Sequence, residues 1–312
     1  GHNSGASRPV IVSFMFWQTT RYSIDLTRPQ VMGIVNVTPD SFSDGARHAD
    51  LSAALNHCER LLRDGAHILD IGGESTRPGA PPVPLEEELA RVVPLVREAV
   101  RFGVPISVDT FKPAVMQAVL DLGADIINDI RALGQPGAVE VVSRHPSCGI
   151  CLMHMHRDPL TMQVLPMQGD VVPSVRTFLS QAAVRATSAG VARGRIVLDP
   201  GIGFGKTVAQ NFSLLARQAE LLAEGFPLLV GWSRKSSLGA VTATQGLAPE
   251  AASRLAASVA AAVLAVDRGA AIVRVHDVLE TVQALAVWGA MREQAKPDSH
   301  ILIANKDQET LG

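Results

Sequence analysis

Residues 65–70 read GAHILD: a glycine, a run of mainly apolar residues and a closing aspartate. The same form returns in five other places, at residues 103–109 (GVPISVD), 123–128 (GADIIN), 194–199 (GRIVLD), 225–231 (GFPLLVG) and 269–274 (GAAIVR). A left-handed glycine commonly ends a helix, and a strand buried on both faces of a parallel sheet is almost continuously apolar. Each copy therefore predicts the end of a helix followed by a buried parallel strand.

Two further apolar runs, at residues 31–35 and 149–153, bring the strand candidates to about eight. The segments between them are long enough for helices, and Pro113 and Pro173 stand where a first helical turn would begin. This alternation predicts an α/β protein, and the strand count favours a closed (β/α)8 TIM barrel. A doubly wound open sheet would show the same alternation and stays the alternative.

The predicted barrel is a single domain over residues 30–293. Residues 1–29 precede it as an N-terminal extension. Residues 294–312 are polar and lack an apolar period, which predicts a frayed C-terminal tail.

The composition excludes several classes of protein. The 312 residues are 47% hydrophobic, a content that is unlike that of a disordered chain. The 28 basic and 30 acidic residues give a net charge of −2, which argues against a nucleic-acid partner. The longest uncharged apolar run, residues 255–266, has 12 residues, short of the roughly 20 that span a bilayer. With no signal-peptide pattern and only three cysteines, we expect a cytoplasmic protein with reduced thiols and no membrane partner.

Polar residues follow nearly every predicted strand. They are Asn36, Asp70, Asp109, Asn128 with Asp129, His154, Asp199, Ser233 with Lys235, and Arg274 with His276. The carboxyl ends of all strands meet on one face of an α/β barrel, so these side chains should gather there. Any single one could instead cap the next helix, but eight such positions in register favour a site.

The residue types at these strand ends indicate what the site binds. Asp109, Asn128 and Asp199 offer acceptors for the N–H edge of a flat heterocycle. Lys235, with Arg274 and His276, could hold an anion. The pattern therefore predicts one pocket for a polar ring and a phosphate group.

Two loops have the composition of mobile lids. Residues 37–45 and 72–79 combine glycines, hydroxyl side chains, Phe42 and Arg77. Ordinary turns explain the glycines and hydroxyls but need neither Phe42 nor Arg77.

These loops lie in two segments that resemble the signature sequences of dihydropteroate synthases. The segments are VMGIVNVTPDSFSDG (residues 31–45) and GAHILDIGGESTRPG (residues 65–79). Six further blocks are similar to the family in the same order: SVDT (107–110), IINDI (126–130), CLMHM (151–155), LDPGIGFGK (198–206), GWSRKS (231–236) and RVHDV (274–278). The similarity covers about residues 30–290, which is far more specific than one short motif.

The resemblance implies a (β/α)8 barrel that acts as a transferase in folate biosynthesis. Such an enzyme condenses 6-hydroxymethyl-7,8-dihydropterin diphosphate with p-aminobenzoate, giving 7,8-dihydropteroate and diphosphate. It further implies Mg²⁺ as cofactor, a homodimer, and competition by sulfonamides at the aminobenzoate site.

The resemblance also implies roles for individual residues. Asn36, Lys235, Arg274 and His276 would be catalytic, and Asn36 would be the protein ligand of Mg²⁺. The pterin diphosphate would bind Thr76, Asp109, Asn128, Met153, Asp199, Phe204, Gly231, Lys235, Arg274 and His276. The p-aminobenzoate would bind Thr38, Pro39, Phe42, Ser75, Arg77, Pro78 and Ser236. The implied mechanism is dissociative: diphosphate leaves first, and the aminobenzoate nitrogen captures the pterin methylene cation.

Two motif matches carry less weight. Residues 200–207 (PGIGFGKT) are one residue from a phosphate-binding P-loop, but Pro200 stands where that motif has glycine and has no N–H to offer. Cys148 and Cys151, followed by His154, could suggest zinc. Alternation within an apparent strand would point these ligands in different directions, so we do not expect a metal there.

Two other functions stay open. A pterin-binding methyltransferase-type barrel would share the ring acceptors, but it would not need the anion site or the SFSD and STRPG loops. A catalytically silent paralogue acting as a binding protein is the second alternative, and the complete loop sequences argue against it.

Overall fold

The computed structural model describes residues 12–37, 47–163, 165–243, 254–295 and 302–304. Its main sheet has eight strands in the order β10-β11-β4-β5-β6-β7-β8-β9, and every pairing within it is parallel. In chain order these strands are β4 (Gln30–Asn36), β5 (Ile68–Gly72), β6 (Ile106–Asp109), β7 (Ile126–Asp129), β8 (Gly149–Met153), β9 (Ile196–Asp199), β10 (Leu229–Val230) and β11 (Ile272–Val275).

A bridge between Leu198 and Leu228 brings the two ends of this sheet together. The Leu198 N–H also donates a hydrogen bond to the Pro227 carbonyl over 2.9 Å. The sheet therefore curls into a (β/α)8 barrel, which confirms the predicted fold and excludes the open doubly wound sheet.

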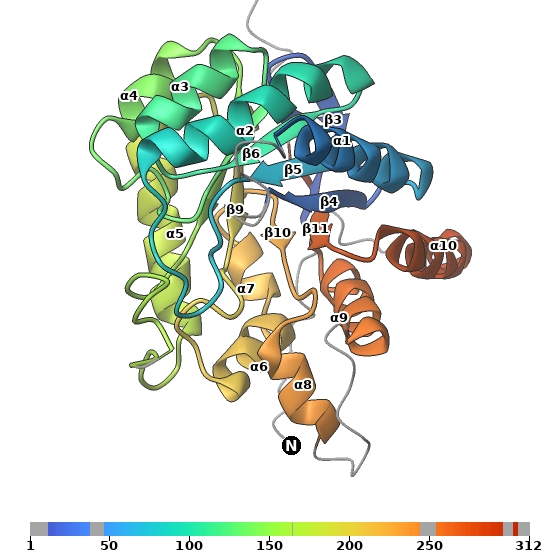
Figure 1. Cartoon of the computed structure of the whole chain (residues 1–312). Helices are drawn as coiled ribbons and strands as arrows, with labels where there is room; N and C mark the ends of the chain where they lie inside the picture. The colour runs from blue at the N-terminus through green and yellow to red at the C-terminus, as the bar shows by residue number, and fades with distance from the viewer. Residues whose placement is uncertain (1–11, 38–46, 164, 244–253, 296–301, 305–312) are drawn as a thin grey trace, which may run out of the picture.

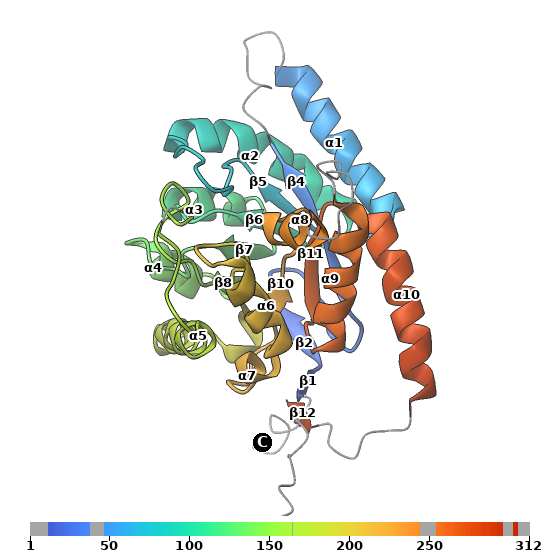
Figure 2. The same cartoon turned by 90° about the horizontal axis from the view of Figure 1, so that it is seen from below.

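Helices surround the barrel on its outside, as Figures 1 and 2 show. They are α1 (Arg47–Arg63), α2 (Leu85–Ala99), α3 (Pro113–Asp121), α4 (Ala138–Arg144), α5 (Val172–Ser188), α6 (Val208–Ala216), α7 (Ala219–Leu222), α8 (Ser236–Ala243), α9 (Leu255–Asp267) and α10 (Val278–Gln294), with 3-10 turns at Val100–Phe102 and Arg193–Arg195. Pro113 begins α3, as its fixed φ angle favours. Within the described residues, the longest apolar run forms α9, and none of the helices is long and apolar enough to cross a membrane.

Burial explains the repeated sequence form. All residues of β5, β6, β7, β8 and β9 are buried, because side chains on one face fill the barrel and those on the other pack under the helices. Gly65 and Gly123, which precede two of these strands, have φ angles of +105° and +96°. Glycine adopts this conformation without steric cost, and so it ends each helix where the chain turns into the barrel.

The N-terminal segment covers one end of the barrel. Strands β2 (Phe16–Gln18) and β3 (Ser23–Asp25) form an antiparallel hairpin, and the fully buried Trp17 donates from Nε1 to the Arg195 carbonyl over 3.0 Å. A Cβ atom at Gly149, where β8 begins, would lie only 3.0 Å from Trp17 Nε1. Part of the predicted N-terminal extension thus belongs to the end of the barrel where the strands start.

Two short strands from the N-terminal and C-terminal parts of the described chain also pair. Strand β1 (Val12–Phe14) pairs in parallel with β12 (Leu302–Ala304). The expectation of a frayed tail over residues 294–312 is therefore wrong at residues 302–304. Backbone pairing along a strand edge needs no apolar period, so the sequence pattern did not indicate it.

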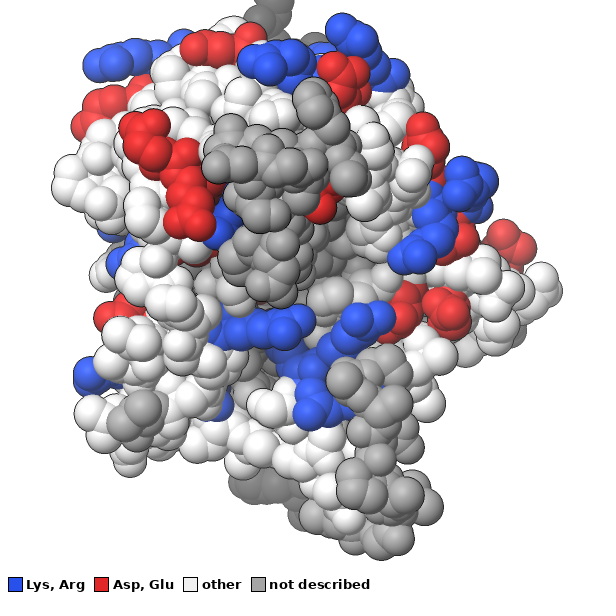
Figure 3. Space-filling view, in the orientation of Figure 1, with Lys and Arg blue, Asp and Glu red and all other residues white. Residues whose placement is uncertain are grey.

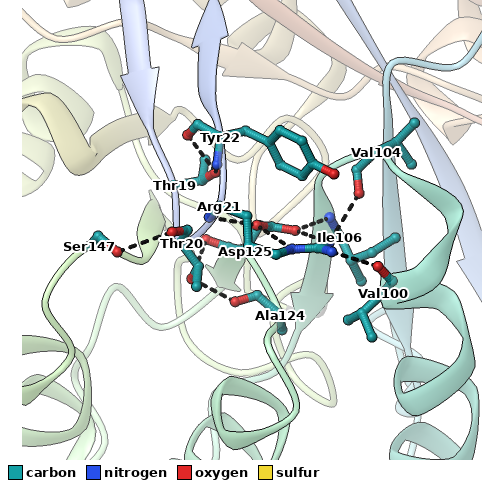
Figure 4. Close-up of polar contacts among 10 residues, drawn as sticks. All are labelled: Thr19, Thr20, Arg21, Tyr22, Val100, Val104, Ile106, Ala124, Asp125 and Ser147. Carbon is teal, nitrogen blue, oxygen red and sulfur yellow. Dashed lines mark hydrogen bonds and ion pairs between the residues drawn. The ribbon is translucent and has the colours of Figure 1, made fainter.

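Asp125, the residue directly before β7, joins the hairpin to the barrel (Figure 4). Its carboxylate is fully buried and accepts hydrogen bonds from Arg21 Nη2 (2.8 Å), Arg21 Nε (3.2 Å), Arg21 N (3.0 Å) and Ile106 N (2.9 Å). Arg21 also donates to the carbonyls of Val100 and Val104. One carboxylate thus satisfies donors from the hairpin turn and from β6.

We predict that Asp125→Asn lowers the melting temperature by about 5–10 °C. The substitution removes the charge of a buried ion pair and leaves one of the surrounding donors unsatisfied, a cost of about 2–4 kcal/mol. Thermal unfolding followed by circular dichroism measures the change. Glu98→Gln is the matched control, since its pair with Arg101 is exposed and should matter by no more than about 1 °C. Equal melting temperatures for Asp125→Asn and wild type would contradict this role.

Candidate functional site

Arg274 of β11 is the centre of a charged cluster where the strands end. Its Nε donates to Asp70 Oδ2 over 2.7 Å, and its Nη2 lies 3.4 Å from Asp109 Oδ2. Asn128 donates from Nδ2 to the same Asp70 oxygen over 3.2 Å. The Asp70 side chain is fully buried, whereas that of Arg274 is 22% exposed. The cluster therefore joins β5, β6, β7 and β11 across the mouth of the barrel.

Three predicted acceptors line this mouth: Asp109, Asn128 and Asp199. Asn128 Oδ1 is buried and has no hydrogen-bond partner among the described residues. Burial, with a smaller effect of the neighbouring Asp70 carboxylate, raises the pKa of Asp109 to about 8. Burial also raises the pKa of Asp199, against the opposing effect of Lys235. Because these groups are desolvated and not fully paired, a ligand with several N–H donors would satisfy them.

Lys235 brings a cation to the same mouth. Its Nζ donates to the Ile202 carbonyl and lies 5.1 Å from the centre of the Phe204 ring. Burial lowers the pKa of Lys235 to about 8, although the Asp199 carboxylate acts in the opposite direction. A Cβ atom at Gly231 would lie 3.7 Å from Arg274 Cβ and 3.8 Å from Lys235 Nζ. Glycine at this position therefore leaves space beside the two cations.

The surface around the site carries further positive charge. Figure 3 shows Lys and Arg side chains gathered over the segment between β10 and α8. Arg234 lies in this segment and pairs with Asp277 over 3.0 Å. A chain with a net charge of −2 thus presents a local positive surface.

Residues 200–207 do not form a phosphate-binding loop. The Gly201 N–H donates to Asp199 Oδ1 (2.8 Å), and the Gly203 N–H donates to Asn211 Oδ1 (2.9 Å). Lys206 is buried, and its Nζ donates to the carbonyls of Gly201 (2.8 Å) and Phe204 (3.2 Å). The two amide N–H groups already donate to side chains of the protein, and the lysine donates to carbonyls of the loop itself. These groups are therefore not available to bind phosphate as they would be in a P-loop.

Two polar residues at the strand ends serve the fold. Asp129 accepts from the backbone N–H groups of Arg131 (2.8 Å) and Leu133 (2.9 Å), so it caps the turn after β7. His154 is buried and packs edge-on against Phe178 of α5, with 4.9 Å between ring centres. Asp129 therefore stabilises a turn rather than the site, and it does not cap the next helix, α4, whose N-cap is Gly137.

The loop after β5 is tethered by ion pairs that the sequence did not indicate. Lys112 Nζ lies 2.7 Å from Glu74 Oε2 and 2.6 Å from Glu88 Oε1. Thr110 donates to the other Glu88 oxygen over 2.6 Å, and the Val83 N–H donates to Glu74 Oε1 over 3.0 Å. These contacts fix the two ends of the segment between β5 and α2.

The remaining predicted residues lie around the mouth or outside the described part of the chain. Ser75, Arg77 and Pro78 are exposed in the tethered loop, and Thr76 is half-buried there. Met153 is buried at the end of β8, and Ser236 is exposed at the start of α8. Thr38, Pro39 and Phe42 lie outside the described residues. The contacts expected for p-aminobenzoate therefore stay predictions.

Asn36 is the last residue of β4 and is exposed, so its amide oxygen is open to a ligand. The described residues contain no group of three or more His, Cys, Asp or Glu side chains that could hold a metal ion. A metal at this mouth would have to take most of its ligands from water and substrate, as Mg²⁺ does.

Sequence reasoning missed several residues of this site. Asp70 and Ser233 were noted at strand ends but received no role, and their position there was the available signal. Lys206 closes the LDPGIGFGK block, which was compared with the family and with a P-loop, but it received no role of its own. No sequence pattern indicated the contact between Lys112 and Glu88, because these residues are 24 positions apart and meet only in the folded barrel.

Comparisons with known proteins agree with this geometry. The model of the family described as "Pterin binding enzyme" matches residues 32–276. A dihydropteroate synthase of Neisseria meningitidis serogroup B is 51% identical over 280 residues, which cover 88% of this chain and 97% of the relative.

Solved structures are similar along the same length. Burkholderia cenocepacia dihydropteroate synthase complexed with 7,8-dihydropteroate has a TM-score of 0.80 and 52% identity, over 90% of this chain and 98% of that one. Xanthomonas albilineans dihydropteroate synthase with 4-aminobenzoic acid has a TM-score of 0.81 and 47% identity, over 89% and 98%. The family match, the identities and the coverage together show that the chain belongs to the pterin-binding enzymes and, among them, to the dihydropteroate synthases.

Proposed function

We propose that the barrel mouth joins 6-hydroxymethyl-7,8-dihydropterin diphosphate to p-aminobenzoate, giving 7,8-dihydropteroate and diphosphate. The observation that carries the proposal is the juxtaposition of buried N–H acceptors with cations: Asp109, Asn128 and Asp199 lie beside Arg274 and Lys235. A pterin has an edge rich in N–H groups, and its diphosphate is an anion. The similarity to the B. cenocepacia enzyme, whose structure holds dihydropteroate, supports the same substrate class.

The acceptors would bind the pterin ring. Asn128 Oδ1 and the carboxyl groups of Asp109 and Asp199 would accept from the amino and ring N–H groups. Lys235 would donate to the ring carbonyl, exchanging its present bond to the Ile202 carbonyl. Met153, Phe204 and Gly231 would shape the slot for the ring.

The cations would bind the diphosphate. Nε and Nη2 of Arg274 contact carboxylates, which orients the guanidinium plane and leaves Nη1 to reach the anion. The same planar group can lie against the pterin ring. His276 and Thr76 would add hydrogen-bond donors to the diphosphate.

Asn36 fits a role as the protein ligand of Mg²⁺. Its exposed amide oxygen is a hard donor at the strand end, and Mg²⁺ usually keeps several waters and binds substrate phosphates. When bound, Mg²⁺ would neutralise charge on the leaving diphosphate.

The chemistry needs no nucleophilic side chain. The bond between the pterin methylene carbon and the diphosphate oxygen breaks, and its electron pair leaves with the diphosphate. The aminobenzoate nitrogen then forms the new C–N bond and loses one proton. Arg274 and His276 would stabilise the developing anion through fixed hydrogen-bond donors, while Lys235 holds the ring carbonyl.

The loops at residues 37–45 and 72–79 would exclude water, which would otherwise capture the pterin methylene cation. Ser75, Arg77, Pro78 and Ser236 would surround p-aminobenzoate, together with Thr38, Pro39 and Phe42. Sulfonamides, which share the shape of p-aminobenzoate, should compete for this site.

We predict that the purified protein turns over the pterin diphosphate, p-aminobenzoate and Mg²⁺ into dihydropteroate and diphosphate, measured by diphosphate release and chromatography. Lys235→Ala and Arg274→Ala should each lose at least about 100-fold in kcat/KM, because each removes a preorganised donor. Chelation of Mg²⁺ should stop turnover reversibly.

Arg176→Ala, which breaks an exposed ion pair on α5, is the control and should leave the rate unchanged. No turnover at saturating substrates would refute the synthase and favour the silent paralogue. Wild-type rates in both Lys235→Ala and Arg274→Ala would contradict the assignment of these side chains to the pterin ring and the diphosphate.

The homodimer stays a proposal, with support from one surface. Helices α9 and α10 lie side by side (Figure 2) and expose Leu264 (44%), Leu279 (42%), Val287 (73%) and Met291 (56%). Apolar side chains in such number on neighbouring helices suit burial against a second copy of the chain.

We predict that Val287→Glu combined with Met291→Glu converts a dimer into a monomer in sedimentation-velocity experiments. Two buried charges in an interface would each lack a partner. Val184→Glu, at a similarly exposed position of α5, should leave the assembly unchanged. A wild-type protein that sediments as a monomer at micromolar concentration would rule out the dimer.

A further inference from the structure

We infer that Ser233 is a positioning residue that holds the neutral His276 ring in the tautomer with its proton on Nε2. That proton would then be presented to the diphosphate as a hydrogen-bond donor. The inference rests on the proposed function for the role of the donor, but the tautomer itself can be measured without turnover.

Two contacts of one hydroxyl group carry the inference. Ser233 Oγ lies 2.8 Å from His276 Nδ1 and accepts a hydrogen bond from the His276 backbone N–H over 3.0 Å. A hydroxyl group has a single hydrogen and two lone pairs. The backbone N–H takes one lone pair, and Nδ1 is the only acceptor that the described residues place within hydrogen-bond distance of this hydroxyl group, so its hydrogen goes to the ring. Nδ1 is then the acceptor, and a neutral ring carries its proton on Nε2.

The surrounding turn fixes the direction of this hydroxyl. Ser233 is buried, and the next residue, Arg234, has a φ angle of +59°, which few non-glycine residues adopt. The Arg234 N–H donates to Ser258 Oγ over 2.9 Å, and its side chain pairs with Asp277 over 3.0 Å. The turn after β10 is thus tied to α9 and to the segment after β11, which carries His276.

The charged groups near His276 favour a neutral ring. Burial, together with the nearby Arg234, Arg274 and Arg77, lowers the pKa of His276 to about 3, against the opposing effect of Asp277. At neutral pH the ring therefore has one proton, and the position of that proton decides what the ring can do. With the proton on Nδ1, Nε2 would present a lone pair to the diphosphate oxygens and repel them. With the proton on Nε2, the ring donates to them.

The tautomer can be read directly from the ring ¹⁵N shifts of histidine in the wild-type protein. The His276 signals are identified by their loss in His276→Ala. We expect a protonated Nε2 and an unprotonated Nδ1 in wild type, and a mixture of tautomers in Ser233→Ala. A wild-type ring protonated on Nδ1 would overturn the inference, whether or not the protein turns over substrate.

A double-mutant cycle tests whether Ser233 acts through His276. Ser233→Ala alone should reduce kcat about 10-fold with little change in KM for p-aminobenzoate, and should weaken binding of inorganic diphosphate with Mg²⁺ by a similar factor. In the His276→Ala background the same change should cost less than about 2-fold, because the ring it positions is gone.

Equal losses in both backgrounds would show that Ser233 supports the fold rather than the histidine, and would overturn the inference. Absence of turnover in the wild type would refute the proposed function instead. The diphosphate titration and the ¹⁵N spectra would then still decide the tautomer.

Discussion

The ion pair between Arg274 and the fully buried carboxylate of Asp70 organises the mouth of this barrel. Its 2.7 Å contact, together with the Asn128 bond to the same carboxylate oxygen, joins strands that are far apart in the sequence. Buried ion pairs add little to stability once desolvation is counted, but they fix side-chain direction. The direction of Arg274 is what the proposed site needs, since one guanidinium must serve both a flat ring and an anion.

The same cluster explains how a chain of net charge −2 can bind an anion. Asp70 offsets the charge of Arg274 in the ligand-free protein. Burial raises the pKa of Asp109 to about 8 and so favours the neutral form of that carboxyl group. A ligand that brings its own N–H donors and its own negative charge can then engage acceptors and cations together. The acceptors of the site would thus meet the N–H groups of the substrate, and its cations would meet the anionic end of the same substrate.

Much of the fold was predictable, because each strand repeats one local pattern. The glycine, the doubly buried apolar run and the polar closing residue are all properties of neighbouring positions, and parallel register then places Asp109, Asn128 and Asp199 on one face. Roles for individual residues came from the family resemblance.

Contacts between distant parts of the chain were not predictable. The Arg21–Asp125 pair, the Lys112–Glu74–Glu88 cluster and the pairing of β1 with β12 each depend on the assembled barrel. No pattern within a short window indicates which lysine meets which glutamate. Polar residues at strand ends were also ambiguous in sequence, and only the fold separates Asp129, which caps a turn, from Asn128, which lines the site.

The central claim is that one substrate spans the acceptors and the cations of the barrel mouth. A crystal structure of the protein with 6-hydroxymethyl-7,8-dihydropterin diphosphate tests it most directly. We predict ring N–H groups on Asp109, Asn128 and Asp199, with the diphosphate against Arg274 and His276. A pterin bound elsewhere, or one whose diphosphate points away from Arg274, would contradict the claim.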